Sequence, residues 1–109
     1  KGKKPHDSDQ LKQFRFDAED QLRYVASIRA TDPITANMLL NNIVFVLTGL
    51  FFDLRLQWTP APKQRLESIH QISPAFYKLL ETIYQGGLNI SEKINLVLQM
   101  IAIVFDTTS

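Results

Sequence analysis

The sequence predicts an all-α fold, an antiparallel bundle of four to five helices with a central helix at 33–57. Apolar residues recur at helical steps of three and four, capping residues and prolines precede these segments, and no stretch keeps a strand-like alternation. Hydrophobic residues are 45% and charged residues 21% of the 109, as in one packed globular domain. We expect a disordered basic leader at 1–8 and a single helical domain at 9–109.

The first predicted helix has one apolar and one charged face. Its apolar residues recur at helical spacing and are Leu11, Phe14, Ala18, Leu22 and Val25. Asp7, Ser8 or Asp9 can cap its start, because a side-chain oxygen there accepts a hydrogen bond from a free backbone amide. Asp7 and Asp9 also have the spacing of a Mg²⁺-binding carboxylate pair, but no strand precedes them, so we favour capping.

Residues 33–57 predict the central helix. Asp32 is a suitable N-cap, and Pro33 fits the first helical position. Pro33 to Phe52 carry no charge over 20 residues and are apolar on nearly every side, which predicts burial all round. The alternatives are a buried strand at 43–47 and a membrane span. The length of the run favours a helix. Amides that are costly in lipid favour a soluble protein, and they are Asn37, Asn41 and Asn42.

The rest of the chain predicts shorter helices. Two prolines within 58–62 end the central helix, because proline lacks an amide donor and restricts the residue before it. A helix follows at about 62–71, and the next begins with the Ser-Pro pair at 73–74 and ends at Gly86-Gly87. The last helix begins with a capping-box pattern at 89–92.

Composition excludes several functions. Twelve Lys and Arg against 11 Asp and Glu give a net charge of +1, so we do not expect a nucleic-acid partner. The chain has no Cys and two His, which excludes a disulfide scaffold, Cys-ligated zinc and a multi-histidine metal site, and we predict no metal site. Its four Gly form no phosphate-binding loop. The absence of Cys fits a cytoplasmic location.

Arg65 and His70 form a candidate catalytic pair. Their spacing is similar to the R-x4-H signature of HEPN-type helical domains, many of which are RNases. In that chemistry the histidine is the general acid or base and the arginine stabilises the phosphorane. On a straight helix, however, the two side chains would lie about 140° apart. We therefore favour the alternative, an exposed Arg65 with His70 packed near the helix end.

A cluster of cationic residues beside Trp58 forms a candidate binding site. Arg55, Trp58, Lys63 and Arg65 flank the rigid proline turn. An aromatic ring with cationic neighbours can hold an anionic or polar ligand by stacking and charge. The alternative is a solvated turn in which Trp58 covers the end of the bundle.

Part of the chain resembles a known family. Residues 52–63 read FDLRLQWTPAPK, and an Ile-Ser-Pro step follows at 72–74. Between 47 and 84, about a third of the chain, the sequence resembles the C-terminal helical, substrate-binding domain of bacterial nucleotidyltransferases, an aminoglycoside-nucleotidyltransferase-like bundle related to HEPN domains. Trp58, Pro60 and Lys63 match that pattern, and Arg55 stands where the family tends to have Asn.

The resemblance implies a non-catalytic accessory domain that helps to build a substrate cleft or a dimer contact. Catalysis would belong to a partner domain with a Gly-Ser dipeptide, which this chain lacks. Mg²⁺ and a nucleoside triphosphate would bind to that domain, so we expect no cofactor here. The expected partner is the protein's own catalytic domain or a nucleotidyltransferase, with no membrane partner.

Two other functions stay open. The first is a HEPN-type RNase or nucleotide-binding module using Arg65 and His70. The second is a structural bundle that forms a homodimer, because the helices at 33–56 and 94–105 carry more apolar surface than one small bundle covers.

Overall fold

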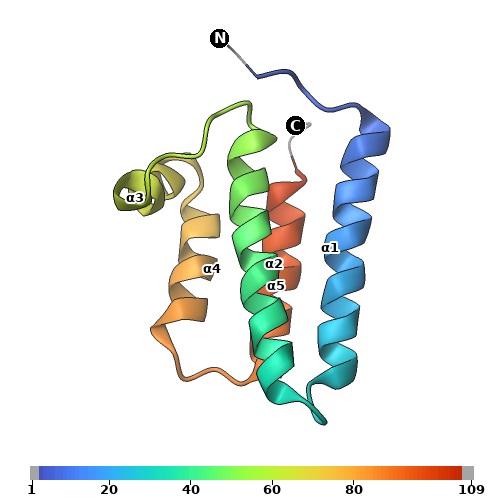
Figure 1. Ribbon diagram of the computed structural model, residues 1–109. Helices are drawn as coiled ribbons and strands as arrows, with labels where there is room; N and C mark the ends of the chain where they lie inside the picture. The colour runs from blue at the N-terminus through green and yellow to red at the C-terminus, as the bar shows by residue number, and fades with distance from the viewer. Residues whose placement is uncertain (1–2, 107–109) are drawn as a thin grey trace.

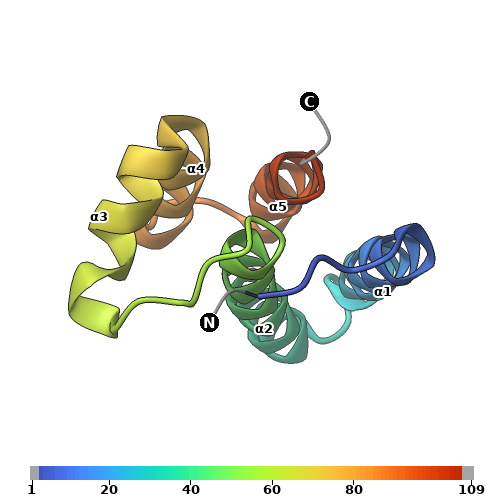
Figure 2. The ribbon, with the colours of Figure 1, turned by 90° about the horizontal axis from the view of Figure 1, so that it is seen from above.

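The computed structural model describes residues 3–106, which form five helices. They are α1 (Ser8–Ile28), α2 (Pro33–Asp53), α3 (Pro62–Ile72), α4 (Pro74–Gln85) and α5 (Ile90–Val104). No strand occurs in the described residues, so the all-α prediction is confirmed and the alternative strand at 43–47 is wrong. Four helices run along the bundle, and α3 lies at a steep angle to them beside α4 (Figures 1 and 2). Residues 1–2 of the predicted leader and 107–109 of the predicted domain lie outside the described residues.

Side-chain caps fix the starts of four helices. The Asp7 side chain accepts a hydrogen bond from the Gln10 amide, and the Gln10 side chain accepts one from the Asp7 amide. Asp32 caps α2, Ser73 caps α4 and Asn89 caps α5. Each cap satisfies a backbone donor that has no partner within its helix. These starts follow the sequence prediction closely, because capping is a local interaction.

The central helix ends earlier than predicted. α2 stops at Asp53, not at 57, and residues 54–56 form a turn. Leu56 has a φ of +59°, and the Gln57 amide donates to the Phe52 carbonyl oxygen at 2.9 Å. A residue in the left-handed region ends a helix, and here that residue is not a glycine. The helical spacing of apolar residues continues through this turn, so the sequence pattern did not indicate where α2 ends.

α2 and α5 lie side by side at the centre of the bundle and run in the same direction (Figure 1). α1 packs against both of them, whereas α4 packs closely on α5 and α3. Consecutive long helices are antiparallel, as predicted, but the central pair is parallel. The C-terminal ends of α2 and α5 therefore meet at one end of the bundle.

The core contains apolar side chains from all five helices. Every buried side chain among the described residues is hydrophobic. The rings of Phe51 and Phe76 stack with a centroid distance of 4.5 Å and an interplanar angle of 5°. Phe52 meets the edge of Phe51 at 5.3 Å. The Phe51–Phe76 contact joins α2 to α4, two helices whose backbones do not approach closely.

One side of α2 is exposed, so the prediction that this helix is buried all round is wrong. Ile34, Met38 and Phe45 have exposed fractions of 74%, 67% and 70%. The other four helices do not surround α2, and Figure 2 shows one side of it without a neighbouring helix. By length and composition α2 could cross a membrane, but core helices of soluble proteins meet the same criterion.

Candidate functional site

Arg55 lies where α2 and α5 end. Its guanidinium donates to the carbonyl oxygens of Phe51 at 3.1 Å, Ile103 at 2.9 Å and Val104 at 3.3 Å. Burial lowers the pKa of Arg55, and the charge of Asp106 opposes that effect. The last carbonyls of a helix have no partner within the helix and carry the negative end of its dipole. In this structure Arg55 thus caps two helix ends.

The other residues of the candidate binding site make different contacts from Arg55. Trp58 has an exposed fraction of 68%, and the Lys3 ammonium lies 3.9 Å from the centroid of one of its rings. Lys63 is exposed near the start of α3. Trp58 therefore does not cover the end of the bundle. The turn between α2 and α3 presents an aromatic ring and cationic groups to solvent.

Arg65 and His70 have separate partners. The Arg65 guanidinium donates to the Pro60 carbonyl oxygen at 3.2 Å from Nε and 3.1 Å from Nη2. The His70 ring packs on Tyr77, with 4.6 Å between centroids. No hydrogen bond joins Arg65 to His70 in residues 3–106. Arg65 contacts the segment before α3, and His70 packs against α4.

An ionic cluster surrounds Asp53 at the end of α2. Lys3 Nζ lies 2.9 Å from Asp53 Oδ1, and His6 Nε2 lies 2.6 Å from Asp53 Oδ2. The hydrogen bonds from Lys3 and then His6 lower the pKa of Asp53. His6 also meets the ring of Phe14 edge-on at 5.2 Å. Lys3 and His6 belong to the predicted leader, and their contacts with Asp53 were not foreseen because 47 or more residues separate the partners.

The described residues contain no group of three or more His, Cys, Asp or Glu side chains placed to hold a metal ion. Asp7, half of the carboxylate pair noted in the sequence, is the α1 cap. Asp9 lies exposed in the first turn of α1. This arrangement uses the Asp7 carboxylate for helix capping.

The most distinctive surface feature is one side of α2, here called the α2 face. It consists of Ile34, Met38, Asn41, Asn42, Phe45 and Gly49. At 100° per residue these positions fall within an arc of about 100°. All except Gly49 are exposed, and none is charged. Within residues 3–106, Asn41 and Asn42 form no side-chain hydrogen bond, so their amides face solvent.

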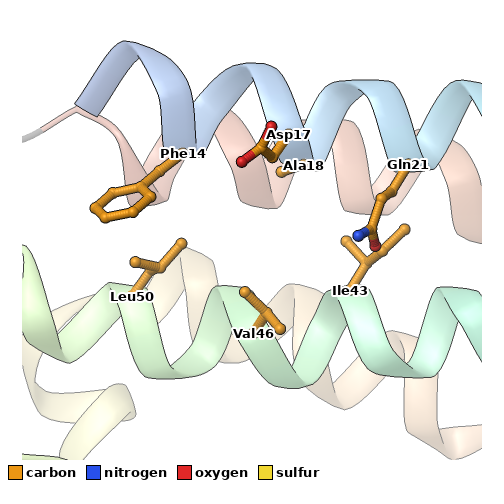
Figure 3. A pocket seen from close by; sticks show the side chains of 7 residues that line it. All are labelled: Phe14, Asp17, Ala18, Gln21, Ile43, Val46 and Leu50. Carbon is orange, nitrogen blue, oxygen red and sulfur yellow. The ribbon is translucent and has the colours of Figure 1, made fainter. Parts of the chain in front are cut away.

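Two apolar grooves flank the α2 face. One, of about 290 Å³, lies between α1 and α2, where Phe14 and Ala18 face Val46 and Leu50 (Figure 3). The other, of about 330 Å³, lies between α2 and the α3–α4 pair. Its lining includes the exposed side chains Phe45, Leu66 and Tyr84. The apolar surface therefore extends beyond the α2 face on both sides.

A third hollow, of about 290 Å³, lies at the C-terminal end of the α2 face. Its lining includes Phe45, Thr48, Gly49, Thr59 and Arg65. A Cβ atom placed on Gly49 would have no non-neighbouring atom within 4 Å. The missing side chain thus leaves open space on the outside of the helix.

Comparisons of the chain with protein-family models, with curated proteins and with solved structures found no match. The class of protein that the fold defines is a five-helix bundle with one exposed apolar helix face. Sequence analysis did not single out this face. The signal for it is the spacing of Ile34, Met38, Phe45 and Gly49, but apolar residues also occupy the other sides of α2, so the sequence pattern does not distinguish the exposed side.

Proposed function

We propose that this chain is a non-catalytic interaction domain that docks on another protein surface through the α2 face. The observation that carries the proposal is the exposure of Ile34, Met38 and Phe45, at 74%, 67% and 70%, on a helix without charge from Pro33 to Phe52. Contiguous apolar patches on protein surfaces mark interaction sites, because covering them removes apolar area from water.

The polar residues support a non-catalytic function. Arg55 and Arg65 donate to backbone carbonyl oxygens, and His70 packs on Tyr77. A phosphoryl-transfer or RNase site would need these groups to converge on one point where negative charge develops. Their observed partners instead stabilise the bundle, which favours binding over a HEPN-type RNase activity.

The resemblance between residues 47–84 and nucleotidyltransferase helical domains supports a narrower proposal. Under this narrower proposal, the bundle is the accessory domain of a cytoplasmic nucleotidyltransferase. The exposed turn with Trp58 and Lys63 then faces the substrate cleft of the catalytic domain. Trp58→Ala in the full-length protein should then weaken ligand binding. An unchanged affinity would remove Trp58 from the ligand site.

Site-specific photocrosslinking in the cells that naturally make the protein tests the docking proposal. A photoreactive phenylalanine analogue replaces Phe45 in one variant and Lys12 in a matched control. Lys12 is exposed and lies about 160° around α1 from Phe14, which faces the α1–α2 groove. We expect a protein adduct from position 45 and none from position 12. Equal or absent adducts at both positions would overturn the proposal.

A further inference from the structure

We infer that the α2 face binds a second copy of this chain, with the two α2 helices antiparallel across a two-fold axis. This inference rests on the proposed docking function and names its partner. In a two-fold interface the same surface is used twice, so each feature must meet its complement on an identical surface. The α2 face satisfies that condition when the axis passes between Asn41 and Asn42.

In this register, a large side chain of one copy lies opposite a hollow on the surface of the other. Ile34 of each copy lies opposite Gly49 of the other, because both positions are equally distant from the axis. Ile34 projects from the surface with an exposed fraction of 74%, and the hollow of about 290 Å³ lies at Gly49. A side chain entering a hole on the facing helix is the usual packing of paired helices. The two ends of the interface therefore fit each other.

The same register brings Met38 of each copy against Phe45 of the other. Both side chains are at least two-thirds exposed, at 67% and 70%. A thioether near an aromatic ring makes a favourable contact, and burying both removes apolar surface from water. These two symmetric contacts lie between the centre and the ends of the interface and would supply most of its apolar area.

At the centre, Asn41 of each copy meets Asn41 of the other on one side of the seam, and the two Asn42 side chains meet on the opposite side, because consecutive residues lie about 100° apart around a helix. An amide side chain both donates and accepts, so two such groups can satisfy each other. A polar Asn in an otherwise apolar helix interface fixes register and orientation, because any shift leaves the amides buried without partners. Asn41 and Asn42 form no side-chain hydrogen bond within the described chain, so both are free to pair in this way.

Charge also favours a second copy. The segment from Pro33 to Phe52 carries no charge, so two copies can approach without repulsion. A charged partner would bury its charges against this face without counter-ions, which is costly. The α2 face has six residues, against roughly 20–30 residues a side in a standard interface of about 800 Å² per partner, so we expect a dimer that dissociates on dilution.

Sedimentation velocity over a wide concentration range tests the inference. The mass should rise from 12.5 kDa toward about twice that value. Met38→Glu and Phe45→Lys should each remain monomeric, because each places two charges in the homodimer interface. An equimolar mixture of the two should regain a dimer, since Glu at 38 then faces Lys at 45. Lys12→Glu is the matched control and should dimerise like the unchanged chain.

Crosslinking tests the orientation, and the absence of Cys makes it simple. Asn41→Cys should give a covalent dimer with a short thiol crosslinker. Ile34→Cys should not, because antiparallel pairing separates its two copies by about 22 Å along the helix axis. Crosslinking at both positions would show a parallel pair and overturn the inferred geometry.

A mass of 12.5 kDa at every concentration, or a charge-swapped mixture that stays monomeric, would overturn the inference. Flotation of the chain with phosphatidylcholine vesicles, abolished by Phe45→Lys and without a dimer in solution, would assign the face to a membrane instead. If the chain is monomeric but position 45 crosslinks to a different protein in cells, the inference that the partner is a second copy is wrong, and the proposed docking function is supported. If position 45 gives no adduct, both the homodimer inference and the proposed docking function are overturned.

Discussion

Arg55 Nη2 donates to the carbonyl oxygen of Ile103 at 2.9 Å, across 48 residues of sequence. This contact exists because α2 and α5 run in the same direction and end together. The Arg55 guanidinium also lies 4.2 Å from the centroid of the Phe51 ring. One side chain thus neutralises carbonyls of two parallel helices and covers an aromatic ring of the core.

We predict that Arg55→Leu lowers the free energy of unfolding by about 2 kcal/mol, because hydrogen bonds that involve a charged group contribute about 1.5–3 kcal/mol. Urea denaturation followed by circular dichroism measures the change. Lys63→Ala, at an exposed cation, is the control and should change stability by less than about 0.5 kcal/mol. Equal effects of the two substitutions would contradict the capping function of Arg55.

The stacked pair of Phe51 and Phe76 should couple α4 to the central helices. Phe76→Ala should destabilise the protein by about 3–5 kcal/mol, the usual cost of removing a buried phenylalanine ring. The milder pair Phe51→Leu and Phe76→Leu, with the double variant, isolates the interaction. We expect a coupling energy of about 1 kcal/mol. Strict additivity in the denaturation midpoints would show that the rings do not interact energetically.

Stability should depend on pH through Asp53. Folding lowers the pKa of this carboxyl, first through Lys3 and then through His6, so the folded state binds its proton less readily than the unfolded chain. The contribution is complete above the ordinary aspartate pKa of about 3.9 and is lost as the pH falls through the lower folded value. Because the cluster is only partly buried, we expect about 0.5–1 kcal/mol. Melting temperatures of the unchanged chain and Asp53→Asn should differ at pH 6 and converge only as the pH falls below the lowered folded-state pKa of Asp53.

The purified chain should not cleave RNA. Arg65 donates to Pro60 and His70 packs on Tyr77, and no hydrogen bond joins the two side chains in residues 3–106. Incubation with a fluorophore-labelled RNA should leave it intact, and Arg65→Ala should show its effect in thermal stability instead. Cleavage by the unchanged chain that disappears in His70→Ala would establish the RNase activity that the structure disfavours.

Local signals in the sequence predicted most helix boundaries. Asp32 with Pro33, Ser73 with Pro74, and Asn89 with Glu92 mark helix starts through interactions within four residues. The C-terminal end of α2 was placed at 57 because Leu54 and Leu56 continue an apolar pattern. The turn that ends the helix depends on the φ of Leu56, which composition does not encode.

The functions of the polar residues could not be predicted in the same way. Arg55 was a candidate ligand contact because it lies near Trp58 in sequence, but its partners are backbone carbonyls 48 and 49 residues away. The Lys3 and His6 contacts with Asp53 likewise depend on where the chain returns in space. For the α2 face, periodicity identified the helix but not which side lacks a neighbour.

Helix α3 comes close to a single neighbouring helix, α4, and the Arg65 contact with Pro60 tethers its first turn. Such a unit can open without unpacking α1, α2 and α5 from one another. Backbone amides of α3 should therefore exchange with deuterium well before those of α2, because local opening of α3 needs less free energy than unfolding of the whole bundle. The width of the neighbouring groove would then vary with this local opening, while the α2 face stays rigid.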